Sequence, residues 1–577
     1  MQQNKPTRQI AEFGVIGMII ILVLSISVLA WVPPVSRDAL IHHLAIPKLW
    51  IEHGGIYEIP ESSFSYYPMN LDLLYTVPLI LHNDIIPKFI HLIFGLLTGW
   101  LVYRYLEKRI SRIYGLVGAL FFLSIPVVVK LCITVYVDLG LVFFSTAALL
   151  QVLDWIDNRY ALKNLFLAAV FCGLALGTKY NALIVFFLLS VFIPFSYLRL
   201  SQGKSQNQLK AIGYSLIFVT ISLSIFSPWM IKNYLWTGNP VYPLYNSWFD
   251  NKAAPNNISA TPDNASVVES IDNQDKIGWG HFSTRKFVYH ETLGEILTIP
   301  LRIFFQGRDD NPKYFDGKLN PFLLLLPLVA FRRFKQDPDH FRVEKIILMT
   351  FCLLYLLITF LQTDMRIRYI APIIPPLVIL SVFGLKNLVS PGDFARNRIK
   401  NRCYKAVGFI AIVGMLGMNT SYLYGQFKTV DPLPYISGRI ERDAYINRHR
   451  PEYPSIQYIN SHLPENSKIL GVFLGNRGYY FDKTIIFDFS FMKKSVKESS
   501  MGDFLREAFQ QRQITHIILR HDLFNSWAKN TFNQKKINIL ETFFRDHTRL
   551  LFSKTGYGVY ALNSNMPTQK AKKPYVQ

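Results

Sequence analysis

Long apolar runs constrain the fold of this chain more than any other feature of its sequence. The first covers residues 13–32, twenty positions without a charged side chain, and such a length crosses roughly 30 Å of hydrocarbon. The basic residues Lys5 and Arg8 ahead of it, with the Val-Leu-Ala stretch at 28–30, also fit a cleaved signal peptide. Signal peptides carry an apolar run of roughly 7–15 residues. We therefore predict a retained membrane anchor.

Further apolar runs follow throughout the first 424 residues. Half of the 577 residues are apolar and 17% are charged, whereas about a quarter of the residues of a soluble domain are charged. The runs are continuously apolar rather than alternating, which favours helices as the spanning structure. We predict about eleven such helices, near residues 12–32, 85–103, 114–130, 136–153, 163–178, 181–197, 211–229, 319–331, 346–363, 367–385 and 405–424.

The net charge of +22 follows the same topology. Lysines and arginines crowd the short connections at 104–112, 199–210, 332–335 and 396–402. These connections alternate along the chain, as the positive-inside rule requires of cytoplasmic loops. We therefore attribute the charge to topology and expect no nucleic-acid partner. An odd number of spans predicts a cytoplasmic N-terminus and a C-terminus on the opposite side.

Three hydrophilic regions then fall on the outer side. Two are loops, 33–84 and 230–318, within a membrane domain of residues 1–424, and the second contains a polar stretch, 250–276, typical of a flexible insert. The third, 425–577, alternates short β-rich runs with helical patterns, which predicts a small extracytoplasmic α/β domain. The predicted strands are 468–473, 484–489, 516–520 and 558–562, and one predicted helix is 501–512.

The cysteines give no sign of a disulfide framework or a metal site. None has CxxC spacing, all lie in or beside apolar segments, and the long hydrophilic regions have none. The four are Cys132, Cys172, Cys352 and Cys403.

The first outer loop carries the most informative acid. Residues 36–52 directly follow the first span, and their pattern predicts an amphipathic helix on the outer membrane surface. Asp38 and His42 are four residues apart and share one face of that helix. A partly desolvated carboxylate at this surface can act as a general base toward an acceptor hydroxyl. The structural alternative makes Ser36 the N-cap and Asp38 a first-turn acid favoured by the helix dipole.

A second acid and three cations lie at other outer turns. Asp138 opens the predicted fourth span, where an acid is costly unless it has a partner or a function, or is a solvated end residue. Lys179, Arg366 and Arg368 lie in outer turns and break the positive-inside pattern. Cations beside a bilayer suit a phosphate, which arginine binds with paired hydrogen bonds. The alternative is a salt bridge to Asp364 or contact with lipid headgroups.

Several short motifs are spread over most of residues 10–425. The most recognisable is Ser-Pro-Trp-Met-Ile-Lys-Asn at 227–233, followed by Gly-Asn-Pro-Val-Tyr-Pro at 238–243. The others are Arg37-Asp38-Ala39 with His43-Leu44, Tyr66-Tyr67-Pro68, Tyr136-Val137-Asp138, Lys179 after a glycine-rich helix, Phe315-Asp316-Gly317 and Arg368-Tyr369-Ile370-Ala371-Pro372. In this combination the chain resembles the GT-C superfamily, specifically the bacterial relatives of protein O-mannosyltransferases and aminoarabinose transferases.

The resemblance implies a polytopic α-helical glycosyltransferase of the bacterial inner membrane. Such enzymes take a sugar from a polyprenyl-phosphate carrier and transfer it, with inversion, to an envelope acceptor (protein, glycolipid or glycan) on the periplasmic face. Carried over, Asp38 is the base, Asp138 a second carboxylate that orders the site, and Lys179, Arg366 and Arg368 hold the leaving phosphate. Many relatives have an Asp-Glu pair in the first loop where this chain has Asp-Ala, which leaves the second carboxylate open.

Aromatic and imidazole side chains complete the predicted substrate site. His42, His43, Tyr66 and Tyr67 lie in the first outer loop, where tyrosine rings either stack on a sugar or form an interfacial belt. No glycine-rich nucleotide loop is evident, consistent with a lipid-linked donor. Some members of the superfamily use a divalent cation and others do not. The sequence has no ligand cluster that demands one, so it leaves open whether a divalent cation is a cofactor.

Two other classes of membrane protein compete with the enzyme. A transporter or flippase predicts ionisable residues at mid-membrane and internal repeats, whereas the acids here lie at the outer rim and no repeat is evident. A non-catalytic envelope assembly factor would use the C-terminal domain as its working part. The outward-facing carboxylates and cations favour the enzyme.

Overall fold

The computed structural model describes residues 5–201, 206–249, 280–362, 364–389 and 398–563, so the predicted polar insert at 250–276 lies outside the described residues. Contacts divide the chain into two compact units. The helical unit consists of Met1–Val32, Tyr67–Tyr242 and Thr284–Ile436, and the α/β unit of Pro33–Tyr66, Pro243–Ser283 and Ser437–Gln577.

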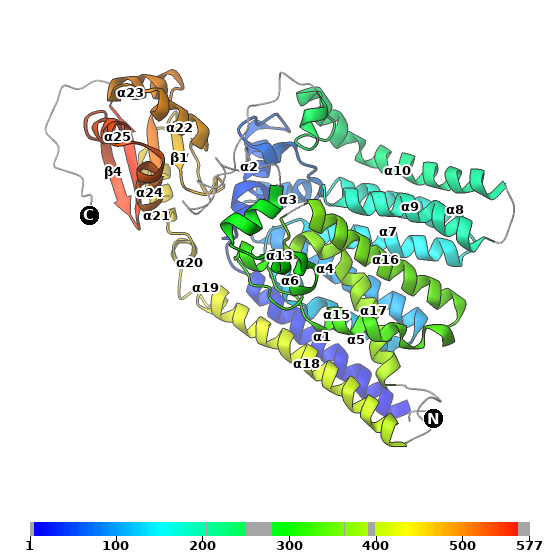
Figure 1. Ribbon diagram of the computed structural model, residues 1–577. Helices are drawn as coiled ribbons and strands as arrows, with labels where there is room; N and C mark the ends of the chain where they lie inside the picture. The colour runs from blue at the N-terminus through cyan, green and yellow to red at the C-terminus, as the bar shows by residue number, and fades with distance from the viewer. Residues whose placement is uncertain (1–4, 202–205, 250–279, 363, 390–397, 564–577) are drawn as a thin grey trace. The chain divides into compact units, whose positions relative to one another are not determined.

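The helical unit holds, in its described part, eight helices long and apolar enough to cross a membrane. Large apolar side chains such as Phe13, Ile21 and Phe195 are exposed on them, which suits a surface covered by lipid. Two of these helices, α1 and α18, lie side by side (Figure 1). The eight are α1 (Lys5–Ala30), α4 (Ile86–Arg109), α7 (Asp138–Asp157), α9 (Ala182–Leu200), α10 (Gln206–Thr237), α16 (Asp339–Gln362), α17 (Ile374–Val389) together with the preceding turn η7 (Ile367–Ile373), and α18 (Arg398–Val430).

The other three predicted spans are bent or short. The third is a pair of helices, α5 (Arg112–Ser124) and α6 (Pro126–Cys132), bent by 68°. Pro126 disfavours a helical conformation in the residue before it, and Ile125 accordingly has ψ 132°. The fifth and eighth are α8 (Leu162–Leu176) and α15 (Phe322–Ala330), shorter than the roughly 20 residues of a full span. Every predicted span thus coincides with helix, and the predicted fold class is confirmed.

Small side chains bring α8 and α10 close together. A Cβ atom on Gly173 would lie 2.7 Å from the Ser222 carbonyl oxygen, and the Ser222 hydroxyl donates to the Ala169 carbonyl over 3.0 Å. Such close approach through small residues is typical of helices packed in membranes. It fixes the end of α8, and with it the turn at 177–181 that carries Lys179.

Short elements complete the helical unit. Several of them lie in the loops that the sequence places outside. They are α3 (Asn70–Ile80), η4 (Thr284–Val288), α13 (Leu293–Leu297), α14 (Ile299–Arg302), η5 (Pro312–Tyr314), η6 (Phe331–Gln336) and α19 (Pro432–Ile436).

The C-terminal part of the α/β unit contains a five-stranded sheet in the order β2-β1-β3-β5-β4. Strand β1 is parallel to β2 and β3, whereas β5 is antiparallel to β3 and β4. The predicted small α/β domain is confirmed. The strands are β1 (Lys468–Val472), β2 (Thr484–Ile486), β3 (His516–Arg520), β4 (Thr548–Lys554) and β5 (Tyr557–Leu562), and the helices are α20 (Arg442–His449), α21 (Tyr453–His462), α22 (Phe489–Glu498), α23 (Gly502–Gln511), α24 (His521–Thr531) and α25 (Gln534–Asp546).

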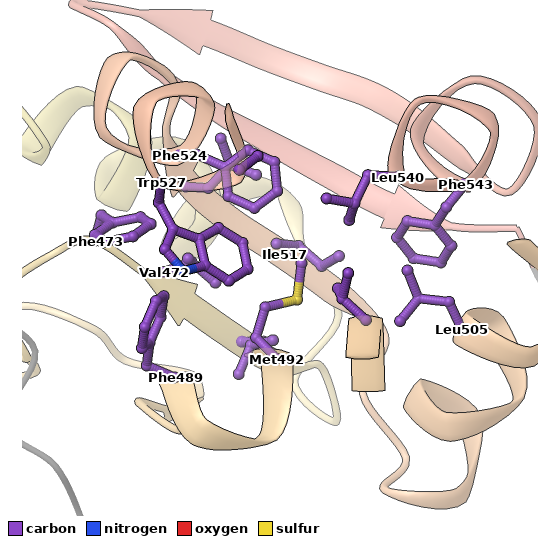
Figure 2. Packing of buried hydrophobic residues seen from close by; sticks show 14 of the residues in the cluster. Val472, Phe473, Phe489, Met492, Leu505, Ile517, Phe524, Trp527, Leu540 and Phe543 are labelled. Carbon is purple, nitrogen blue, oxygen red and sulfur yellow. The ribbon is translucent and has the colours of Figure 1, made fainter. Parts of the chain in front are cut away.

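An apolar core holds these helices on the sheet. Trp527 is buried, and its ring centroid lies 5.1 Å from that of Phe489 and 5.5 Å from that of Phe524 (Figure 2). Burying an aromatic side chain of this size contributes roughly 1.5–3 kcal/mol. The sheet and its helices therefore have their own hydrophobic core.

The first outer loop packs with this domain rather than with the helices that flank it in sequence. The predicted helix at 36–52 has two parts, a π-helical turn η1 (Ala39–His43) and an α-helix α2 (Ala45–His53). In α2, Ala45, Ile46 and Trp50 are buried whereas Glu52 and His53 are exposed, which is an amphipathic pattern. The other short elements of this unit are η2 (Ser63–Tyr66), η3 (Asn246–Trp248) and α12 (Gly280–Ser283).

Candidate active site

Asp138 is the first residue of α7, and a buried histidine of α4 fixes its position. The Leu139 backbone N–H donates to Nε2 of His91 over 2.9 Å. Because Nε2 accepts, the proton must be on Nδ1, which lies 2.9 Å from the Leu131 carbonyl oxygen and donates to it. His91 therefore ties the start of α7 to the end of α6. The sequence analysis missed it, since a lone histidine within a membrane span has no local signal of this role.

The Asp138 carboxylate forms an ion pair with Lys179. Lys179 Nζ lies 2.7 Å from Asp138 Oδ1, and the exposed fractions of the two side chains are 18% and 1%. Asp138 Oδ2 is buried and accepts no hydrogen bond from any residue that the structure describes. Asp138 is therefore not a solvated helix end, and one acid and one cation predicted separately are direct partners.

Contacts with Asn70 hold the turn that carries Lys179. The Asn70 backbone N–H donates to the Gly177 carbonyl over 2.9 Å, and Trp229 Nε1 donates to Asn70 Oδ1 over 2.7 Å. A Cβ atom on Gly177 would lie 2.2 Å from Asn70 Nδ2, so any larger residue would displace the Asn70 amide. Trp229 belongs to the motif at 227–233, which thus helps to position the lysine.

The ring of Tyr369, within η7, brings the cations together. Lys179 Nζ lies 5.7 Å and Arg368 Cζ 5.4 Å from its centroid, and Arg368 Cζ also lies 5.3 Å from the centroid of Tyr136. Arg368 is close enough to Asp138 to interact with it electrostatically. Cations within about 6 Å of an aromatic face are attracted to it. We call Asp138, Lys179, Arg368 and Tyr369 the cation cluster.

Arg366 lies beside this cluster and contacts an acid that the sequence motifs did not pair with it. Its guanidinium lies 3.6 Å from the Asp316 carboxylate and 5.9 Å from the Tyr369 centroid. The alternative partner, Asp364, lies 3.4 Å from Arg285. Asp316 belongs to the motif at 315–317, and the Ile367 backbone N–H donates to the Phe315 carbonyl over 2.8 Å.

Arg285 is a positioning residue that the sequence analysis missed. Its side chain is buried, and it donates to the Lys313 carbonyl over 2.8 Å and to the Met365 carbonyl over 3.2 Å. Glu291 lies 3.6 Å away and balances its charge. These contacts tie the turn before Arg366 to the loop before α15. In the sequence, Arg285 looks like any other loop cation, and only its burial distinguishes it.

Tyrosines of three motifs meet next to the Lys179 turn. Tyr180 donates its hydroxyl to the Tyr242 carbonyl over 2.9 Å and receives a hydrogen bond from Asn233 Nδ2 over 3.0 Å. Tyr67 packs edge-on against Tyr180 with centroids 5.4 Å apart. Burial, followed by the proximity of Tyr369, raises the pKa of Tyr67, which keeps its hydroxyl protonated.

The first outer loop holds the other candidate residues in the α/β unit. Asp38 directly precedes the π-helical turn and makes no capping hydrogen bond with its side chain. The Ser36 hydroxyl is buried and makes no hydrogen bond with the residues described here, so it does not act as the N-cap. The first-turn position of Asp38 stays as the alternative to its role as the base. A π-helical turn often occurs at functional sites.

The remaining candidate residues of this loop, His42, His43 and Tyr66, are buried. His42 stacks on Phe64 with centroids 4.2 Å apart, and its ring lies 4.0 Å from that of His43. Tyr66 is fully buried and donates its hydroxyl to Glu58 over 2.7 Å. Among the described residues, no group of three or more His, Cys, Asp or Glu side chains could hold a metal ion.

Part of this arrangement lies in a segment that matches a known family. Residues 79–231 match the family described as dolichyl-phosphate-mannose-protein mannosyltransferase. This segment contains His91, Asp138, Lys179 and Trp229. No curated protein sequence matches the chain significantly.

Solved structures match over nearly the whole chain. ArnT from Cupriavidus metallidurans in the apo state has a TM-score of 0.55 and 13% identity, over 97% of this chain and 98% of that one. The same protein bound to undecaprenyl phosphate has a TM-score of 0.54 and 13% identity, over 96% and 99%. The Archaeoglobus fulgidus oligosaccharyltransferase tethered to an acceptor peptide has a TM-score of 0.51 and 10% identity, over 96% of this chain and 74% of that one.

At such low identity these likenesses show the fold alone, and the family model covers residues 79–231. The resemblance that the sequence motifs indicate is thereby confirmed. The chain is a multi-pass membrane protein with an ArnT-like fold.

Proposed function

We propose that the chain transfers a sugar from a polyprenyl-phosphate carrier to an envelope acceptor on the periplasmic face of the bacterial inner membrane. One observation carries this proposal: Lys179 and Arg368 share the ring of Tyr369, while Asp138 holds Lys179 through one oxygen. The fold likeness to a protein bound to undecaprenyl phosphate supports the same class of donor.

The charges of the cation cluster suit a phosphate that leaves with increasing negative charge. Lys179 and Arg368 contribute two positive charges, and Asp138 contributes one negative charge, so the three side chains keep a net charge of +1. A sugar phosphodiester has one negative charge, and the departing phosphomonoester has up to two. Charge-assisted hydrogen bonds therefore strengthen as the bond to the anomeric carbon breaks, which lowers the barrier. Arg366, beside Asp316, supplies a further cation.

Asp138 acts in this scheme as a positioning residue rather than as the base. Lysine has three donors, and the contact of 2.7 Å with Asp138 uses one and directs the ammonium group. A carboxylate paired with a cation is a weaker proton acceptor. We assign the base to Asp38, which lies in the first outer loop and would take the proton of the acceptor hydroxyl. A single displacement at the anomeric carbon then gives inversion.

Donor binding tests the phosphate site. Replacing Lys179 or Arg368 by alanine removes a charge-assisted contact of roughly 1.5–3 kcal/mol, so we expect donor affinity to fall about 10- to 150-fold. Binding of a polyprenyl-phosphate sugar to the purified full-length variants measures this. Lys318→Ala, which removes an exposed cation, is the matched control and should bind normally. Normal binding by both Lys179→Ala and Arg368→Ala would refute the phosphate site.

The orientation of the chain has its own test. A cysteine at Ser437 should react with an impermeant thiol reagent added outside intact cells, and one at Gln336 should not, because the basic loops belong to the cytoplasm. Cys403 is exposed, so it is first replaced by serine to lower the background. The opposite labelling pattern would put the candidate acids on the cytoplasmic side and remove the proposed site.

A further inference from the structure

The segment that carries Asp38 is held by its backbone. The Tyr480 hydroxyl donates to the Pro34 carbonyl over 2.7 Å, Arg450 donates to the Val35 carbonyl through Nε over 2.5 Å and also through Nη2, and the Tyr479 backbone N–H donates to the Leu40 carbonyl over 3.1 Å. These carbonyls lie on both sides of Asp38. All the donors come from the C-terminal part of the chain.

A lysine of α2 fixes the far side of the turn to the same place. Lys48 Nζ donates to the Phe481 carbonyl over 2.7 Å, to the Tyr479 carbonyl over 3.2 Å and to Asp482 Oδ1 over 3.1 Å. All three ammonium donors are thus used on one loop, residues 477–482. Its side chain is 23% exposed, so water weakens these bonds only in part. We call this loop, with Arg450, the clamp.

The clamp is itself anchored in the folded domain. Its loop follows β1, whose residues Ile469, Leu470 and Val472 are fully buried. Asn460 of α21 donates to the Tyr480 carbonyl over 2.8 Å and accepts from the Asp482 backbone N–H over 3.0 Å. A continuous set of contacts therefore leads from the sheet core to the backbone around Asp38.

We propose that the C-terminal domain positions the base: Tyr480, Arg450 and Lys48 hold the turn so that the Asp38 carboxylate keeps a fixed place. This inference rests on the proposed function for its chemical consequence. A displacement of about 1 Å at a reacting group can lower a rate 10²-fold. The domain thus contributes to turnover through Asp38.

The test compares two Tyr→Phe substitutions in the full-length protein. Tyr480→Phe removes the bond to Pro34 and keeps the ring, which packs on Tyr453 at 5.1 Å. We expect amide exchange in peptides covering 36–44 to quicken roughly 3- to 10-fold, in keeping with one lost hydrogen bond. Tyr560→Phe, which loses only a contact with His521 inside the domain, should leave that exchange unchanged.

Transfer kinetics provide the second readout. Tyr480→Phe and Lys48→Met should each lower kcat about 10-fold and leave donor affinity unchanged, and Lys48→Arg should restore part of the loss. Unchanged exchange at 36–44 in both Tyr480→Phe and Lys48→Met would overturn the clamp. Faster exchange with normal kcat would overturn its role in positioning. A wild-type protein without transfer activity would refute the proposed function instead, while the exchange data would still decide whether the clamp exists.

Discussion

The cation cluster of the helical unit and the Asp38 turn of the α/β unit are held in different ways. In the cluster, side chains hold side chains: Asp138 holds Lys179, and Tyr369 attracts two cations. In the turn, the backbone carbonyl groups accept the hydrogen bonds, as those of Pro34 and Leu40 do. A substitution within the cluster therefore alters both the chemistry and the packing. A substitution of the Asp38 side chain should alter the chemistry and leave the position of the turn intact.

The largest expected effect comes from Asp38→Asn. This change keeps the size of the side chain and removes the basic oxygen, and the carbonyl contacts of the turn do not involve the carboxylate. If Asp38 is the base, kcat should fall roughly 10²- to 10⁴-fold with donor affinity unchanged, and thermal unfolding shows that the variant is folded. Transfer assays on the purified, monodisperse variant with the identified lipid-linked donor measure this.

Two outcomes would separate the alternatives for this acid. If Asp38 only stabilises the start of the helix, Asp38→Asn should cost about 0.3–1 kcal/mol of local stability and leave turnover nearly normal. That result would transfer the role of base to Asp138 and make our assignment wrong. A loss of folding would break the comparison itself, because it would show that the carboxylate supports the turn.

Asp138→Asn should have a smaller and broader effect. The amide keeps an acceptor for Lys179 but loses the charge of a buried ion pair, so we expect a stability loss of roughly 1.5–3 kcal/mol together with weaker donor binding. Thermal unfolding and donor titration measure the two effects. Glu498→Gln is a suitable control, because Glu498 and its partner Lys494 are 67% and 74% exposed and such pairs contribute at most about 1 kcal/mol. Equal stability of the two variants would contradict a structural role for the Asp138–Lys179 pair.

The spans and most strands could be predicted because their signals are local. Continuous apolar runs indicate spanning helices without knowledge of their neighbours, and β1, β2, β3 and β5 begin within a residue of their predicted starts. Strand β4 was missed. It is an edge strand, and its apolar residues Leu550, Leu551 and Phe552 are consecutive rather than alternating with polar ones, so no period-two pattern indicates it. Pairing with β5 defines it.

The candidate site was predictable in its residue types but not in its pairings. The positions of Asp138, Lys179 and Arg368 follow from charges at outer turns, which are visible in the sequence. That Lys179 pairs with Asp138 depends on the packing of α7 against α8, which the sequence does not contain. His91 and Arg285 act through buried contacts with distant carbonyl groups, so no spacing rule indicates them.

The smallest of these effects concerns the glycine that lets the Lys179 turn approach Asn70. In Gly177→Ala the new methyl group would meet Asn70 Nδ2 at 2.2 Å. The amide lies at the end of a side chain and can shift, so we expect about 1–2 kcal/mol of destabilisation, the lower part of the overpacking range. Shifting Asn70 also disturbs its bond from Trp229, so donor affinity should fall a few-fold.

Gly213→Ala in α10 is the matched control, because no atom lies within 4 Å of its new methyl group. It should be neutral or stabilising by about 0.5–1 kcal/mol, since alanine favours a helix over glycine. Thermal unfolding of both variants and donor titration compare them directly. If Gly177→Ala were as stable as Gly213→Ala and bound the donor normally, the close contact with Asn70 would not position Lys179, and the cluster would depend on the Asp138 pair alone.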